Sequence, residues 1–192
     1  MNCLSLADID NNLGCNGNAP GIVQSVIFGY CEDVATWPTK PVAVDAGGGE
    51  TTPLTLEQAG VLVGDIVMKE GKRAFTFDFT EETGSLTVAP GGQADSTNFT
   101  YTLTLVKAQI NKKIFGFMNA ALSKKVFMIV KDENGVWYLL GNDRRGVTMG
   151  GEGSTTGTTG EDRNHTTLTF TYRSGMALVY EGDTEDILSE TP

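Results

Sequence analysis

The side chains that most often carry enzyme chemistry are few in this sequence, and they are not grouped. The single histidine, His165, lies in the polar run 162–166 without a serine or cysteine motif beside it, so a catalytic triad would have no partner for it. Carboxylates cluster at 81–82 and 183–186, but no cleft can be argued around them, and solvated faces are the simpler interpretation. We therefore expect no catalytic residue and place an enzyme last among the possible functions.

Two segments approach known ligand-binding motifs and depart from them. The run Asp8–Gly14 has the spacing of a calcium loop, but its glycine comes one place late and Ala19 stands where a bidentate carboxylate is needed. The glycine- and threonine-rich run Gly146–Gly160 lacks the lysine-containing ending of a phosphate-binding loop and carries Glu152. We expect a capped turn at the first, a flexible loop that orders on assembly at the second, and neither metal nor cofactor.

The cysteines argue against a disulfide scaffold and a zinc site. There are three, Cys3, Cys15 and Cys31, and no two are spaced as C-x-x-C. An odd number excludes a complete disulfide framework, and the spacing does not support a tetrahedral zinc site. We expect reduced thiols with a structural role.

Composition bounds the class of protein and its partners. The chain has 192 residues, 40% of them hydrophobic, and a formal net charge of −10. Phosphate contacts need lysine and arginine, so a chain this acidic is not expected to bind nucleic acid specifically. No apolar run is long enough to cross a bilayer, and residues 1–10 lack the basic and apolar regions of a signal peptide. We expect synthesis in the cytoplasm and no membrane contact.

The strongest structural signal is alternation of apolar and polar side chains. In residues 98–105, aromatic and leucine side chains alternate with threonines, and residues 74–80 alternate in the same way around Phe75, Phe77 and Phe79. A period of two predicts strands with one buried and one polar face. Asn134-Gly135 between two apolar runs predicts a hairpin over Lys125–Leu140. The polar faces of the two alternating runs contain Thr76, Asp78, Thr80, Thr100, Thr102 and Thr104.

Between these strands the spacing becomes helical. Apolar residues recur every three or four positions in Ala108–Lys124, which predicts one amphipathic helix packed on the sheet. Lys124 and Lys125 suit its C-terminus, where the helix dipole favours cations. The residues expected to form its core-facing stripe are Ile110, Ile114, Phe117, Met118 and Leu122.

The remaining segments are irregular. Residues 1–21 and 37–60 are rich in asparagine, glycine and proline, and the run 37–41 contains two prolines that exclude regular structure. We interpret both segments as arms that clasp neighbouring subunits, with Trp37 as an anchor that pins the second arm. The sequence predicts one mainly β domain over 1–192: an antiparallel β-barrel or sandwich with one packed helix and extended arms.

This order of elements resembles the tube proteins of phage tails and related contractile injection systems. The resemblance rests on the strand 72–80, the strand 99–106, the helix 108–124, the hairpin 125–140 with its following loop, and the closing strand 166–172. It covers about two-thirds of the chain, and the opening run 15–30 resembles virion proteins from phages of gut bacteria. The family has no shared catalytic residues.

The resemblance implies a structural virion protein. Such subunits form rings, usually hexameric, that stack into a hollow tube through which DNA passes during ejection. It implies copies of this chain and other tail proteins as partners, a place in the virion after assembly in the host cytoplasm, and a lumen lined by the six polar-face residues named above. Two alternatives stay open: another virion part, such as a head decoration, connector or baseplate protein, and a carbohydrate-binding module using Trp37, Tyr101, Trp137 and Tyr138.

Overall fold

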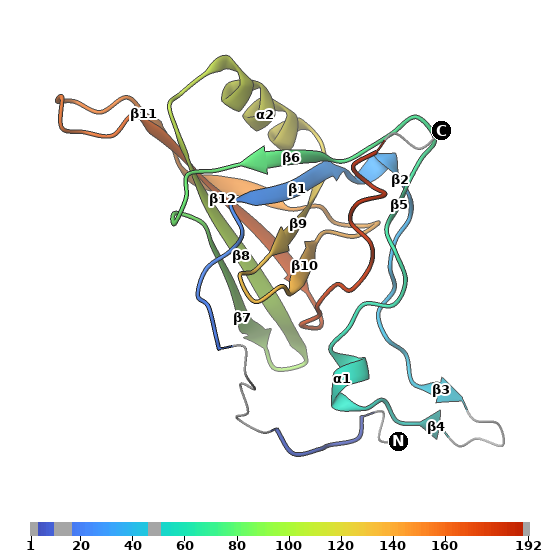
Figure 1. Cartoon of the computed structure of the whole chain (residues 1–192). Coiled ribbons are helices and arrows are strands. Elements are labelled where there is room, and N and C mark those ends of the chain that lie inside the picture. The colour runs from blue at the N-terminus through green and yellow to red at the C-terminus, as the bar shows by residue number, and fades with distance from the viewer. Residues whose placement is uncertain (1–3, 10–16, 46–50, 190–192) are drawn as a thin grey trace.

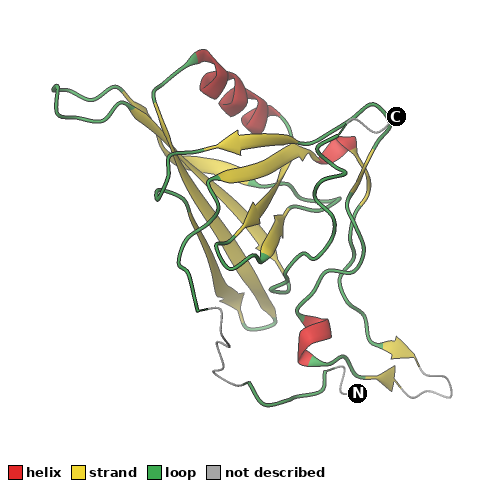
Figure 2. Ribbon diagram, viewed as in Figure 1, coloured by secondary structure: helices red, strands yellow, loops and turns green. Residues whose placement is uncertain are grey.

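The chain folds into a sandwich of two four-stranded antiparallel sheets, as Figures 1 and 2 show. The structure, a computed structural model, describes residues 4–9, 17–45 and 51–189. Strands hold 44% of the chain and helices 11%, which confirms the mainly β class and the sandwich; the sheets do not close into a barrel. One sheet, the central sheet, has the order β10-β9-β1-β6, and the other, the threonine sheet, has the order β11-β12-β8-β7.

The threonine sheet forms around the alternating strand that the sequence predicts. Its strands are β7 (Ser85–Gln93), β8 (Ser96–Ala108), β11 (Thr148–Thr155) and β12 (His165–Ser174). In β8, Tyr101, Leu103 and Leu105 are buried, while the threonines between them are half-buried on the other face. In β12, Phe170 stands opposite Leu103 and continues the buried row. The predicted strands 99–106 and 166–172 are thus neighbours in one sheet.

The central sheet is buried on both faces. Its strands are β1 (Ser25–Tyr30), β6 (Phe75–Asp78), β9 (Val126–Lys131) and β10 (Trp137–Leu140). Five consecutive residues of β9, 126–130, are buried, as a continuous apolar run indicates for a strand covered on both sides. Val126, Met128 and Val130 belong to the inner core between the sheets, whereas Phe127 and Ile129 belong to an outer core on the far face. The β9–β10 pairing confirms the predicted hairpin.

The C-terminal segment 175–189 covers the outer core. Leu178, Tyr180 and Ile187 are 7%, 1% and 1% exposed, and the Tyr180 hydroxyl accepts a hydrogen bond from the Ile66 amide at 3.1 Å. A small sheet of β2 (Val34–Thr36) and β5 (Val67–Met68) and the 3-10 turn Cys31–Asp33 complete this side. The acidic tail of the sequence is therefore a covering layer for the central sheet.

The predicted helix exists but is shorter than expected. Helix α2 spans Lys112–Ser123, because Ala108 still belongs to β8 and the Asn111 side chain caps the helix by accepting from the Ile114 amide at 3.1 Å. Ile114 is buried, and Phe117 and Met118 pack against the inner core. Two members of the predicted stripe differ: Ile110 precedes the helix and is half-buried, and Leu122 is 69% exposed.

The expectation that Leu122 is a core residue is wrong for a geometric reason. Seven residues at 100° each bring Leu122 back to the direction of Phe115, which is 47% exposed, while Ala121 takes the inward position. The apolar sector of α2 is therefore wider than the face that the sandwich covers. An outer apolar line, Phe115 and Leu122, is left on the helix surface.

Between Trp37 and Ile66, which both pack in the outer core, the chain leaves the sandwich as an arm. It carries two short strands, β3 (Val44–Asp45) and β4 (Thr51–Thr52), and one helical turn, α1 (Leu56–Ala59). Figure 1 shows these elements well apart from the two sheets, at the end opposite α2. The described N-terminal residues 4–9 run beside this arm, where the Ser5 amide donates to the Leu54 carbonyl at 2.8 Å. Residues 4–9 of the first predicted arm thus lie beside the second arm, whereas its residues 17–21 lie at the β9–β10 turn, where the Ala19 amide donates to Asn134 Oδ1 at 2.9 Å. Residues 10–16 and 46–50 are outside the described part.

The glycine- and threonine-rich run is in part a strand rather than a flexible loop. Residues 148–155 form β11 on β12, with a bulge between Gly150 and Gly153. Gly151 has φ +109°, and a Cβ there would lie 2.9 Å from the Thr169 amide nitrogen and 3.0 Å from the Thr167 carbonyl oxygen. Because backbone atoms of β12 lie this close to Gly151, the bulge requires a residue without a side chain there.

We expect Gly151→Val to lower the free energy of unfolding by about 1–3 kcal/mol, because the side chain adds both strain and overlap with backbone atoms. Gly150→Val is the matched control, since a Cβ at Gly150 meets nothing within 4 Å and its φ is ordinary. Urea unfolding of both variants measures the difference. Equal stabilities would contradict the assigned bulge.

Candidate functional site

The outward face of the threonine sheet is an ordered array of hydroxyl groups. Strand register places the same residue type side by side: Thr102 lies opposite Thr87 on one side and Thr171 on the other, and Thr171 lies opposite Thr148. The next row holds Ser85, Thr104 and Thr169. The members of this threonine face are Ser85, Thr87, Thr100, Thr102, Thr104, Thr148, Thr167, Thr169 and Thr171.

The threonine face has almost no charge of its own. Among the outward register positions of these four strands, Arg173 is the one charged residue. The negative charge of the chain is concentrated elsewhere: residues 1–68 contain eight acidic residues and one lysine, a formal charge of −7. The face is therefore a neutral, hydroxyl-covered wall without a row of cations.

Of the six predicted lumen residues, the structure brings three together and places the others elsewhere. Thr100, Thr102 and Thr104 lie on the threonine face. Thr76 and Asp78 lie on β6 of the central sheet, where Thr76 stands opposite the outer-core residue Ile27 and so faces away from the threonine sheet. The expectation of one shared face for all of them is wrong, because alternation orders the faces within a strand but does not say which strands share a sheet.

The sixth predicted residue, Thr80, sits at the corner between the sheets. Its amide donates to the Val106 carbonyl at 2.8 Å, and its Oγ1 accepts from the Ala108 amide at 3.0 Å. It fastens the end of β6 to the end of β8. Sequence reasoning missed six members of the threonine face. Three of them, Thr167, Thr169 and Thr171, alternate with Leu168, Phe170 and Tyr172 in the same pattern as β8; the others are Ser85, Thr87 and Thr148.

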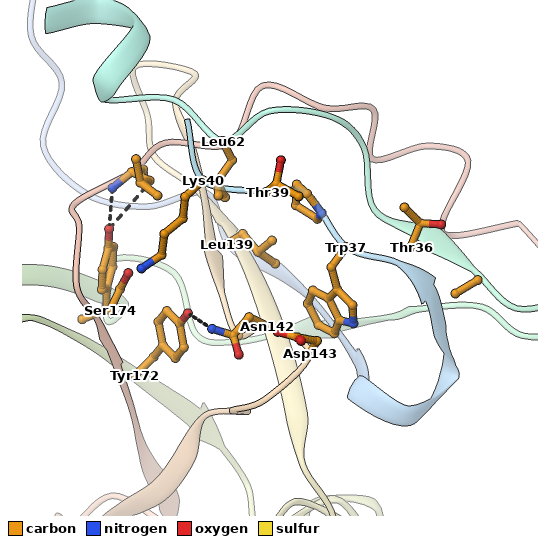
Figure 3. Close-up of a pocket in the computed structure, with 15 residues that line it drawn as sticks. Thr36, Trp37, Thr39, Lys40, Leu62, Leu139, Asn142, Asp143, Tyr172 and Ser174 are labelled. Atoms are coloured by element: carbon orange, nitrogen blue, oxygen red, sulfur yellow. Dashed lines mark hydrogen bonds between the residues drawn. The ribbon is translucent and has the colours of Figure 1, made fainter. Parts of the chain in front are cut away.

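Trp37 anchors the base of the arm. Its ring meets the Phe127 ring edge-on, with centroids 5.6 Å apart and an interplanar angle of 84°, and it packs against the outer core. Beside it lies a pocket of about 500 Å³, drawn in Figure 3, whose wall includes Lys40, Asn142 and Tyr172. The pocket therefore sits where the arm leaves the sandwich.

Two tyrosine hydroxyls in the wall of this pocket connect segments of the chain. The Tyr172 hydroxyl accepts from Asn142 Nδ2 at 2.9 Å, and the Tyr101 hydroxyl accepts from the Leu178 amide at 2.8 Å. Burial raises the pKa of both tyrosines, so the hydroxyls stay protonated at neutral pH. The wall contains neither histidine nor cysteine. This is the chemistry of a structural junction.

The aromatic residues named for carbohydrate stacking do not form a platform. Trp137 packs against the outer core and Tyr138 against the inner core, on opposite faces of β10, as expected for adjacent strand residues. Tyr101 is 2% exposed. The sheet separates the rings of Trp137 and Tyr138, so these two side chains cannot stack on one sugar.

The other candidates for chemistry are dispersed. His165 begins β12 with Nδ1 3.2 Å from the Arg163 carbonyl oxygen, and burial raises the pKa of the Cys31 thiol to about 11, which keeps it protonated. Cys3, Cys15 and most of the run Asp8–Gly14 lie outside the described residues. Within residues 4–9, 17–45 and 51–189, no three metal-ligating side chains gather, and no helix there is long and apolar enough to cross a membrane.

Comparisons with protein-family models, with curated proteins and with solved structures find no match for this chain.

Proposed function

We propose that this chain is the subunit of a hollow phage tail tube that conducts DNA during ejection. Copies of the chain form rings, the rings stack, and the threonine face of each copy lines the lumen. The observation that carries the proposal is this face: a long, regular array of small hydroxyls on one side of a sandwich, with the acidic arms elsewhere. Its partners are other copies and other tail proteins, in the virion.

A wall of this kind suits the passage of DNA. Lysine and arginine rows bind phosphate through counterion release, and the threonine face has no such row. The formal net charge of the whole chain, −10, further disfavours retention of a polyanion. DNA therefore meets a surface that neither fixes its backbone nor reads its bases.

The edges of the threonine sheet support assembly into rings. One edge strand, β7, is nine residues long, and all of its side chains are exposed except that of Leu86. A long exposed edge strand can pair with another chain, and natural monomers usually blunt such edges; β7 carries one such device, Pro90, and its first five residues are free of proline and glycine. In a ring each subunit covers the edges of its neighbours.

We expect the threonine face to become inaccessible on assembly. In Thr102→Cys, the new thiol should react in the dissociated subunit with a maleimide polymer too large to enter the tube, and should be protected in the assembled particle. Thr76→Cys is the comparison from the opposite face of the sandwich. Mass spectrometry of the labelled peptides separates these positions from the native cysteines. A thiol that reacts equally fast before and after assembly in Thr102→Cys would contradict a lumenal threonine face.

A further inference from the structure

Charge is segregated along this chain to an unusual degree. Residues 96–131, which include α2, contain six lysines and no acidic residue, whereas residues 1–68, which include both arms, contain eight acidic residues and one lysine. The two regions are opposite in sign. The two regions meet where β1 pairs with β9 and where Lys124 contacts Glu32, but α2 lies at the top of Figure 1 and the arm at the bottom, so these two parts do not meet within one copy.

Each region also carries exposed apolar side chains. On the arms, Leu6, Ile9, Val42 and Val63 are 84%, 88%, 76% and 56% exposed. The last two line a shallow groove of about 470 Å³ together with Pro41, Leu54 and Val61, and the carboxylates of Glu57 and Glu181 border it. We name these residues the arm groove.

The matching surface is the outer line of α2. Phe115 and Leu122 lie two helical turns apart on one line, 47% and 69% exposed. Lys112 borders this line, and Lys113 lies on the other side of the same helix; neither forms an ion pair within the described residues, whereas Lys124 at the helix end pairs with Glu32. An apolar line on a helix that carries lysines and no carboxylate thus faces solvent on one end of the molecule, and an apolar groove bordered by carboxylates on the other.

We propose that the arm groove of one copy docks on the outer line of α2 of the next copy. The proposal rests on the tube function above and names the surfaces through which copies join. Because the two surfaces differ, the contact is heterologous, and repeated contacts of this kind generate closed rings or open stacks. The apolar residues supply the burial, and the opposed charges set the orientation and exclude contacts between like surfaces.

Two variants test the pairing. An arm variant, Val42→Ser with Val63→Ser, and a helix variant, Phe115→Gln with Leu122→Gln, change only exposed side chains, so circular dichroism and melting should stay close to wild type. Each variant should need about tenfold or more protein to assemble, because apolar burial is lost. Val67→Ser, at a residue 45% exposed on β5, is the control and should assemble normally.

Mixing the two variants gives the decisive result. Each mixed pair retains one intact groove and one intact helix line, so an equimolar mixture should form particles of twice the mass of either variant alone and grow no further. Analytical ultracentrifugation measures this. Variants that assemble like wild type, or a mixture no larger than its components, would overturn the docking while leaving the tube proposal standing. A wild-type chain that never assembles would overturn both.

Charge reversal provides an independent readout. Lys112→Glu with Lys113→Glu, or Glu57→Lys with Glu181→Lys, should each weaken assembly most at low salt, because the helix and the groove then carry charges of the same sign. A chain carrying all four reversals restores opposite signs across the contact and should assemble again. Four reversals that assemble no better than two would contradict the pairing of these surfaces.

Discussion

Removal of everything after Ser174 is expected to abolish folding of the subunit. The segment 175–189 supplies Leu178, Tyr180 and Ile187 to the outer side of the molecule, and without this cover Phe127 and Ile129 of β9 would face water. Loss of one large buried side chain costs about 2–5 kcal/mol, and a whole domain is stable by only about 5–15 kcal/mol. Circular dichroism and limited proteolysis of the shortened chain should show an unfolded protein.

Removal of residues 1–14 is the matched control. The described part of this segment, residues 4–9, contacts the arm through the backbone bond to Leu54 and leaves Leu6 and Ile9 exposed. We expect an unchanged melting temperature and impaired assembly. If this chain unfolds while the chain lacking its C-terminal segment stays folded, the assignment of covering layer and arm is reversed.

Phe117→Ala is expected to lower the free energy of unfolding by about 2–4 kcal/mol, because it removes a partly buried ring that packs against the inner core. Its ring joins α2 to both sheets: its centroid lies 4.9 Å from that of Phe28, 5.0 Å from Phe77 and 6.0 Å from Phe170. Phe28 and Phe77 belong to the central sheet and Phe170 to the threonine sheet, so one side chain holds both layers to the helix. Urea unfolding below the assembly concentration gives the value.

Leu122→Ala is the control for this variant. Spacing alone makes the two residues equivalent members of one stripe, but Leu122 is 69% exposed, and a surface change of this kind alters stability by about 0.5 kcal/mol or less. A loss of 2 kcal/mol or more at Leu122, or none at Phe117, would show that α2 is rotated relative to the sandwich described above.

These two residues illustrate how far periodicity carries a prediction. Alternation in 98–105 and Asn134-Gly135 between apolar runs are local signals, and the structure has β8 and the β9–β10 hairpin where they indicate. The sequence predicts that a helix forms here. Which of its side chains are buried depends on the width of the surface that the two sheets present to it. That width is a tertiary property, so Leu122 could not be separated from Phe117 by spacing.

Only part of the threonine face could be predicted from the sequence, for a related reason. Thr100, Thr102 and Thr104 follow from the pattern of a single strand. Thr76 is predicted on the same face because its strand alternates in the same way, yet β6 pairs with β1 in the other sheet. Strand pairing between distant segments is set by the whole fold, and nothing local in 74–80 encodes it. The burial of the C-terminal segment 175–189 could not be predicted, because its few apolar residues are interspersed with carboxylates that indicate a solvated tail.

Electron microscopy of the purified 192-residue chain over a range of concentrations tests the tube proposal. We expect rings with an open centre and, at higher concentration, tubes formed by their stacking. A population that stays monomeric at every concentration and salt condition, with neither rings nor filaments, would contradict the proposal.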